Sequence, residues 1–172
     1  MKPDFLSSIR ARWFWALAAA ILLTDCATKR VAEIELAPAN IPHPVVGDVV
    51  RLTLAYNQGS AMSLWTGPEA RVLLSLFAVV ALAVMVRLYR GTPSDQRVRI
   101  AGLALVVGGA AGNLLDRIRS PRGVVDFIDV GFGSWRFWVF NVADIGVTIG
   151  AVLLAWAISQ HREASPLPAP SP

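Results

Sequence analysis

The chain has 172 residues, of which 55% are hydrophobic, and a net charge of +4. Its length fits one domain, and a mean hydropathy of +0.53 argues against an ordinary soluble protein. The basic residues lie mostly at the ends of apolar runs and form no recognisable nucleic-acid motif, so we expect no nucleic-acid partner. A single cysteine, Cys26, excludes an intramolecular disulfide.

Four apolar segments predict membrane-spanning helices, because each approaches the roughly 20 residues that cross a bilayer. The first has the layout of a secretory signal peptide, with basic residues, an apolar core and small residues around Cys26. Asp25 stands where a small residue would precede a processed cysteine, so we interpret this segment as a retained helix. The small residues from Gly108 to Gly112 predict close contact with a neighbouring helix. The expected spans are about 13–31, 71–89, 100–115 and 139–159.

Two segments between these spans are expected outside the membrane. Residues 32–69 contain helix-ending prolines and then alternate apolar and polar side chains from Val50 to Tyr56, which predicts a small β-element. Residues 116–138 are interpreted as a loop, and its aromatic side chains suit a membrane interface.

The distribution of charge predicts the orientation. The N-terminal segment, the region joining the second and third helices and the tail together hold eight basic and three acidic residues, so this side is expected to be cytoplasmic. The predicted fold class is an all-α membrane protein with four transmembrane helices, both termini cytoplasmic and a small extracytoplasmic β-element. Residues 1–164 would form a single domain, and the Pro-rich tail 165–172 would be disordered.

Two aspartates have strongly apolar neighbours. Asp126 lies in Val124-Val-Asp-Phe-Ile-Asp129, and Asp144 ends Phe140-Asn-Val-Ala-Asp144 at the start of the last apolar run. Charges at a membrane boundary are costly and are therefore rarely without function. Two carboxylates that meet share a proton, so one can take a proton from water while the other donates to a carbonyl oxygen. Such a pair would hydrolyse an amide without a metal or a covalent intermediate.

The residues for other hydrolytic mechanisms are missing from the sequence. It has no cysteine–histidine cluster for zinc. Of its two histidines, His43 lies in a Pro-rich stretch and His161 follows the last apolar run, which disfavours a Ser-His-Asp triad. We therefore expect no metal and no cofactor.

Further polar residues are expected near the outer ends of the helices. Lys29 follows Asp25 by one helical turn, and Asn141 precedes Asp144 by three residues, where it would cap the last helix. Asn57 would come from the β-element. The third helix contributes Asn113, Asp116 and Arg117.

The same residues also permit structural interpretations. Asp116 beside Arg117 would be an ion pair at a helix end, and Asp25 with Lys29 would be another. Asp144 would simply favour the positive end of the last helix. Asp129 is the weakest catalytic candidate, because a loop aspartate is usually solvated. The residues alone do not choose which two carboxylates form the pair.

Five ordered motifs together resemble bacterial lipoprotein signal peptidase, or signal peptidase II, over about residues 13–159. Any one of them alone would be weak. They are Asp25-Cys-Ala-Thr-Lys29, Tyr56-Asn-Gln-Gly-Ser-Ala61, Gly108-Gly-Ala-Ala-Gly-Asn-Leu-Leu-Asp-Arg117, Val124-Val-Asp-Phe-Ile-Asp129 and Phe140-Asn-Val-Ala-Asp144.

The resemblance implies an aspartic peptidase of the bacterial inner membrane. It implies cleavage of the signal peptide from diacylglyceryl-modified prolipoproteins, before the lipidated cysteine, on the periplasmic side. Asp126 and Asp144 match the family's catalytic dyad, and Asn57 and Arg117 would hold substrate or order the site. The other supporting positions are Asp25, Lys29, Asn113, Asp116 and Asn141. Cys26, Ser60 and Met62 depart from the family's usual residues but do not touch the dyad.

Two other functions remain compatible with these carboxylates. A magnesium-dependent phospho-transfer enzyme of the membrane would use Asp116, Asp126 and Asp129 as ligands, and it would lose activity in a chelator. A small transporter would carry a proton on Asp144. The favoured hypothesis is the peptidase, acting as a monomer on lipidated substrates within the membrane lipid.

Overall fold

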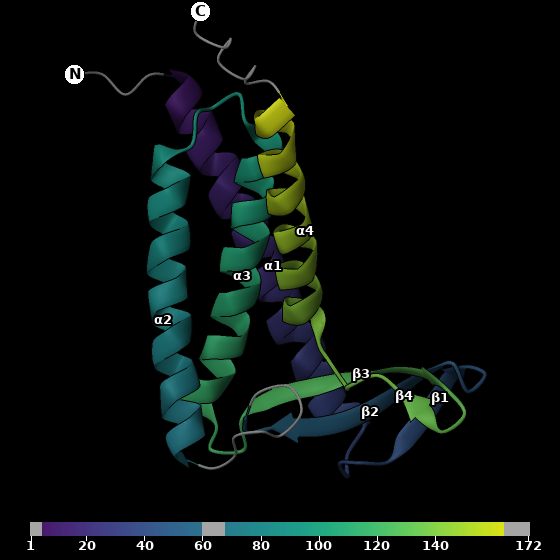
Figure 1. Ribbon diagram of the computed structural model, residues 1–172. Helices are drawn as coiled ribbons and strands as arrows, with labels where there is room; N and C mark the ends of the chain where they lie inside the picture. Colours follow the sequence, from purple (N-terminus) through teal and green to yellow (C-terminus); the bar gives the residue numbers. More distant parts are fainter. Residues whose placement is uncertain (1–4, 60–67, 164–172) are drawn as a thin grey trace, which may run out of the picture.

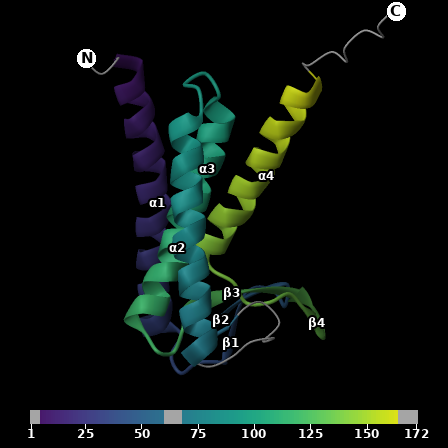
Figure 2. The same cartoon turned by 60° about the vertical axis from the view of Figure 1, so that its left-hand side comes forward.

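Four helices form the body of the computed structural model, which describes residues 5–59 and 68–163. They lie side by side, and both ends of the chain lie at the end of the bundle opposite a small sheet (Figures 1 and 2). α3 contacts all three other helices and is therefore the centre of the bundle. The helices are α1 (Phe5–Glu35), α2 (Pro68–Gly91), α3 (Arg97–Arg119) and α4 (Val142–Glu163).

Three of the described helices are long and apolar enough to cross a membrane. Their qualifying segments are Glu69–Gly91, Arg97–Arg119 and Val142–Gln160, with mean hydropathies of 2.4, 1.7 and 1.9. The large apolar side chains of α2 are mostly exposed, and Phe77 and Val80 are 72% and 61% exposed. Such a surface suits lipid contact, since a soluble protein rarely exposes a large continuous apolar patch.

The helices are longer than the expected spans. α1 continues to Glu35, close to the helix-breaking Pro38, and α3 continues through Asp116 and Arg117 to Arg119. Residues 116–119, which the sequence analysis assigned to a loop, are therefore the last turn of α3. α4 begins at Val142 and not near 139. The predicted disordered tail 165–172 lies outside the described residues.

A four-stranded antiparallel sheet closes one end of the bundle, so the predicted small β-element is confirmed and contains two more strands than expected. The strands are β1 (Pro42–Val46), β2 (Val50–Asn57), β3 (Val124–Phe132) and β4 (Trp135–Arg136), in the order β1-β2-β3-β4. The expected β-element supplies β1 and β2. The predicted loop supplies β3 and β4, because a run of β-branched and aromatic residues between Gly123 and Gly131 pairs with β2.

The sheet packs on the end of α1 through its own apolar cluster. Leu54 of β2 and Val125 and Phe127 of β3 are buried against Ala32 of α1 and Leu36, which follows the helix. Trp135 and Trp138, which the sequence predicts at a membrane interface, do not belong to this cluster and are 68% and 48% exposed. The cluster fixes β3 over the ends of the helices, which places Asp126 above the bundle.

Candidate active site

Asn141 caps α4 and organises the site. Its side-chain Oδ1 accepts a hydrogen bond from the backbone N–H of Asp144 at 3.0 Å, and the Asp144 Oδ2 accepts from the backbone N–H of Asn141 at 3.2 Å. This reciprocal pair is a capping box with aspartate in the third helical position. The predicted N-cap is thus confirmed. The cap fixes the Asp144 carboxylate and leaves the Asn141 amide Nδ2 free to act elsewhere.

The Asn141 amide joins the two predicted dyad residues. Its Nδ2 donates to the Asp126 Oδ1 at 2.6 Å, while the same residue holds Asp144 through the cap. Asn57 of β2 donates to the other oxygen of Asp126 at 3.2 Å. The structure therefore brings Asp126, from β3, and Asp144, from α4, to one place through a shared asparagine.

Asp126 is held in an environment that disfavours its charged form. Its side chain is only 3% exposed. Burial, and next the negative charge of Asp144, raise the pKa of the Asp126 carboxyl to about 7, against the lowering effect of the hydrogen bonds from Asn141 and Asn57. A carboxyl group with this pKa holds a proton for much of the time near neutral pH.

Asn113 connects the dyad to a second set of charges. It donates to the Asp144 Oδ1 at 2.8 Å, and its own oxygen accepts from Asn141 at 3.1 Å and from Lys29 at 2.9 Å. Each polar atom of this amide thus faces a partner on a different helix. Asn113 fixes Asp144 from the side of α3.

Lys29 is the centre of a buried ionic cluster next to the dyad. Its ammonium lies 2.7 Å from the Asp25 Oδ2 and 2.8 Å from the Asp116 Oδ2, as two ion pairs, and it donates to the Asn113 Oδ1 at 2.9 Å. Asp116 therefore pairs with Lys29, and the alternative of an ion pair with adjacent Arg117 was wrong. The expected pairing of Asp25 with Lys29 is confirmed.

The carboxylates of this cluster also bind backbone groups of the elements that carry the dyad. Asp25 accepts from the Ala143 N–H of α4 at 2.8 Å, and Asp116 accepts from the Val125 N–H of β3 at 3.2 Å. Lys29 therefore ties α1 and α3 to both dyad-bearing segments. This geometry indicates a positioning role.

Glycines of α3 allow this close assembly. A Cβ atom on Gly112 would overlap the Asp25 carboxylate, and one on Gly109 would overlap the backbone carbonyl of Ala143. The prediction of close helix contact at the small-residue stretch is therefore confirmed. Any larger residue at Gly112 would move Asp25 away from α4.

Arg117 lies at the edge of the site and is half-buried. It donates to the Asn113 carbonyl oxygen at 3.3 Å, and its positive charge interacts favourably with Asp144 and Asp126. Its buried Nε has no hydrogen-bond partner among the described residues. An arginine with a free donor beside two carboxylates can serve a substrate carbonyl or position the dyad.

Asp129 is not the solvated loop residue that the sequence analysis expected. It is 6% exposed, accepts from Thr53 at 3.0 Å and pairs with Arg136 at 2.7 Å. The sheet turns it away from the dyad because it faces the β2 and β4 side chains. Within residues 5–59 and 68–163, no three His, Cys, Asp or Glu side chains form a cluster suited to a metal. The ligand set of the magnesium hypothesis was therefore wrong.

The sequence motifs did not identify one group of residues near the site, which consists of Arg122, Tyr56 and Glu33. Arg122 donates to the Tyr56 hydroxyl at 2.7 Å and to Glu33 at 3.1 Å, and its guanidinium lies 4.1 Å from the centre of the Tyr56 ring. This contact clamps the start of β3 to β2 and to the end of α1, next to Asn57. The β-branched run between Gly123 and Gly131 was the available signal for a strand here.

The apolar helices and the carboxylates gathered at one end of the bundle together define a membrane-embedded protein with a polar site at the end of its helices. Comparisons with known proteins agree with this class. The family model described as signal peptidase (SPase) II matches residues 17–160. The chain belongs to the signal peptidase II family, as its motifs predict.

Curated relatives match over nearly the whole chain. The lipoprotein signal peptidase of Hydrogenovibrio crunogenus is 37% identical and covers 91% of each chain. That of Geobacter sulfurreducens is 34% identical, over 96% of this chain and all of the relative. That of Rhodococcus jostii is 40% identical, over 88% of this chain and 75% of the relative.

A solved bacterial membrane enzyme, determined by the in meso method at 2.3 Å resolution, has the same fold. Its TM-score is 0.79, its sequence is 23% identical, and the match covers 88% of this chain and 90% of the other. A likeness at this identity supports the fold alone, so the chemistry has to be argued from the site residues.

Proposed function

We propose that this protein is an aspartic endopeptidase that removes the signal peptide from diacylglyceryl-modified prolipoproteins, cutting before the lipidated cysteine. One observation carries the proposal: Asn141 joins Asp126 and Asp144, and the pKa of Asp126 is raised to about 7. A carboxyl pair that holds one proton near neutral pH can act as acid and base at once. The family of the chain supports the choice of substrate.

In the proposed reaction, the scissile carbonyl and one water lie between the two carboxylates. The ionised member takes a proton from the water, whose oxygen attacks the carbonyl carbon, while the protonated member donates to the carbonyl oxygen. The tetrahedral intermediate then breaks its C–N bond as the amine receives a proton. The peptide is cut without a metal, a cofactor or a covalent intermediate.

The remaining site residues have supporting roles in this proposal. Asn113 and Asn141 orient the carboxylates by donating to them. Asn57 and Arg117, at the edge of the site, would contact the substrate backbone. The ionic cluster of Lys29 with Asp25 and Asp116 holds the elements that carry the dyad.

We also propose that α1 is a fourth span of a single domain, residues 1–164, in the bacterial inner membrane. α1 contains Asp25 and Lys29, which lower its hydropathy, but both are buried and paired, so their cost in the membrane is reduced. With the termini cytoplasmic, the sheet and the dyad lie on the periplasmic side. The enzyme is expected to act as a monomer in lipid, without nucleic acid.

The direct test replaces each dyad residue by its amide. Asp126→Asn and Asp144→Asn should leave folded, membrane-inserted protein but lower turnover of a lipidated prolipoprotein by about 10²–10⁴-fold, the usual range for a lost acid or base. Uncleaved lipidated precursor should accumulate. Asp129→Asn is a matched control on the same strand, because it removes a buried carboxylate outside the dyad. Normal processing by either dyad variant would exclude that residue from the mechanism.

A chelator separates this proposal from magnesium-dependent phospho-transfer. Cleavage of the precursor should be unchanged when EDTA is added to the purified enzyme. The second alternative is a transporter that carries a proton on Asp144. In that case the Asp144→Asn variant would lose transport, while the precursor would still be processed normally. Loss of cleavage in EDTA, restored by magnesium, would overturn the proposed mechanism.

A further inference from the structure

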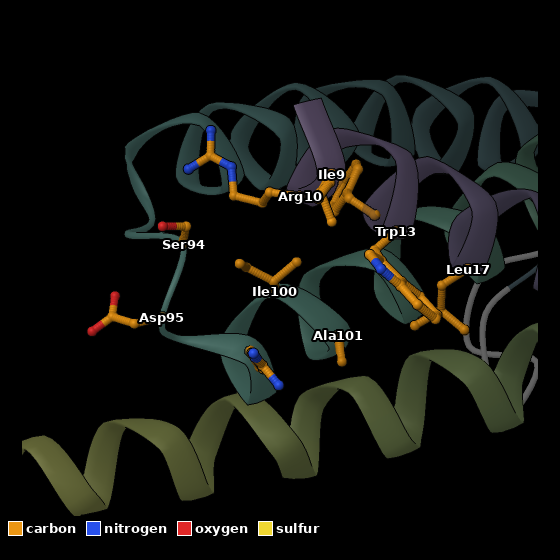
Figure 3. Close-up of a pocket in the computed structure, with 11 residues that line it drawn as sticks. Ile9, Arg10, Trp13, Leu17, Ser94, Asp95, Ile100 and Ala101 are labelled. Atoms are coloured by element: carbon orange, nitrogen blue, oxygen red, sulfur yellow. The ribbon is translucent and has the colours of Figure 1, made fainter. Parts of the chain in front are cut away.

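A cavity lies at the opposite end of the bundle from Asp126 and Asp144. It has a volume of about 630 Å³, within the roughly 300–1,000 Å³ of ligand pockets. α1 forms one wall and the beginning of α3 forms the other, while the α2–α3 linker with Ser94 and Asp95 borders its open end (Figure 3). The termini lie at this end, so the cavity is far from the sheet.

The apolar part of the cavity is preformed. Phe14 of α1 is 1% exposed and stacks on Tyr89 of α2, with ring centres 3.8 Å apart and planes within 14°. Leu17 and Ala104 continue the wall toward the middle of the bundle, and Trp13, which is 73% exposed, stands at its edge. Such a wall requires little reordering when an apolar chain enters.

The entrance to the cavity is basic. The Arg10 guanidinium lies 5.1 Å from the centre of the Tyr89 ring and donates to the Thr92 carbonyl oxygen at 2.5 Å. Its buried Nε has no hydrogen-bond partner among the described residues. Arg97 lines the same entrance and is exposed. Neither arginine is ion-paired within the part of the chain that the structure describes, and Asp95 is the only carboxylate lining the cavity.

We propose that this cavity binds one anionic glycerophospholipid. Its acyl chain would lie along the wall formed by Trp13, Leu17 and Ala104, and its phosphate would face Arg97 and the free edge of Arg10. Two arginines against one aspartate favour a negative headgroup over a zwitterionic one. The site is separate from the dyad and does not depend on the peptidase activity proposed above.

A signal segment of a substrate fits this cavity poorly. Such a segment has an apolar core that would suit the wall, but its N-terminal region is positively charged. That region would meet Arg10 and Arg97 at the entrance, where like charges repel. Charge therefore favours the lipid as the occupant.

The test compares two lipids with the same acyl chains on the purified full chain in detergent. Phosphatidylglycerol and phosphatidylcholine are titrated, and bound lipid is counted by native mass spectrometry. Arg97→Gln should weaken phosphatidylglycerol binding about fivefold, the effect of one basic residue near an anionic lipid, and leave phosphatidylcholine unchanged. Arg90→Gln is the matched control, since it removes one charge at the same end from an exposed position outside the cavity.

The position of the lipid is tested by fluorescence. Phosphatidylglycerol with brominated acyl chains should quench part of the tryptophan emission, and Trp13→Phe should remove that part. Millimolar inorganic phosphate should not displace the lipid, because the acyl chain supplies part of the binding.

Three results would overturn the proposal. One is an equal loss of phosphatidylglycerol binding in Arg97→Gln and Arg90→Gln, which would indicate general charge attraction. Another is quenching that Trp13→Phe leaves intact. The third is displacement of the brominated lipid by a synthetic signal segment, which would assign the cavity to the substrate.

Discussion

Two carboxylate clusters, each with one buried and one partly buried aspartate, lie next to each other in this protein, and they differ in the groups that face them. In the Lys29 cluster, Asp25 and Asp116 form ion pairs with one ammonium, at 2.7 and 2.8 Å. In the dyad cluster, Asp126 and Asp144 accept from the amides of asparagines and from a helix N-terminus. Asn113 joins the two clusters by contacting both Lys29 and Asp144.

The difference separates a cluster that stabilises the fold from a cluster suited to proton transfer. A cation within hydrogen-bond distance offsets the charge of buried carboxylates, so the Lys29 cluster serves to hold helices together. Amide donors solvate a carboxylate without neutralising it, so the charge of Asp144 still raises the pKa of Asp126. In the proposed reaction, the proton needed for acid–base chemistry is therefore held in the cluster that has no lysine.

Removing the cation should give the largest change in stability. Lys29→Ala leaves the buried Asp25 and the partly buried Asp116 without their partner, and we expect the free energy of unfolding to fall by about 3–5 kcal/mol. Turnover per folded molecule should change much less. Denaturant unfolding in detergent, with turnover normalised to folded protein, measures both quantities.

Arg30→Ala is the matched control for that change. Arg30 is adjacent in sequence, its side chain is 72% exposed, and its contact with Glu33 is 3.9 Å. We expect a change of no more than about 0.5 kcal/mol. A stable Lys29→Ala protein that has lost turnover would show that Lys29 takes part in catalysis. It would contradict the contrast between the two clusters.

Substitutions of Asn141 can separate its two roles, which are capping α4 and donating to Asp126. Asn141→Ala removes both the cap of α4 and the donor to Asp126, so stability should fall by about 1 kcal/mol and turnover by about 10²-fold. Asn141→Ser restores a capping oxygen but no amide, so stability should recover while turnover stays low. Recovery of both in the serine variant would mean that the amide contact with Asp126 has no catalytic role.

The pH dependence of turnover tests the proposal that Asp126 and Asp144 share one proton. Because the pKa of Asp126 is raised to about 7, the singly protonated pair is lost as pH rises above that value, and turnover should fall there. The same raised pKa means that Asp126 stabilises the fold at low pH and loses this contribution as pH rises through about 7. A pH–rate profile of kcat/KM measures the first effect. A flat profile from pH 6 to 9 would contradict it.

Asn57 should give the smallest change. Its amide donates to the Asp126 carboxylate and lowers the pKa of that group. Asn57→Ala should therefore move the alkaline limb of the pH–rate profile upward, by roughly the 0.5–1.5 kcal/mol of one hydrogen bond, which is up to about one pH unit. A shift to lower pH would show that Asn57 instead supports the protonated form.

Several parts of the site were visible in the sequence. The cap formed by Asn141 depends on residues three apart, and the pairing of Asp25 with Lys29 depends on residues four apart. Both are fixed by helix geometry alone, so spacing was sufficient. Asp129 and Asp116 were misjudged, because their partners Arg136 and Lys29 come from other segments.

The sequence by itself determined the membrane-type helices, the family motifs and the two aspartates with apolar neighbours, because hydropathy and spacing are local properties. Only the tertiary structure decided that residues 124–132 pair with β2, that Lys29 contacts Asp116 as well as Asp25, and that one asparagine joins Asp126 and Asp144. Those contacts connect residues as far apart as Asp25 and Ala143, 118 positions along the chain. Such pairings depend on how helices and sheet pack, and no local pattern encodes them.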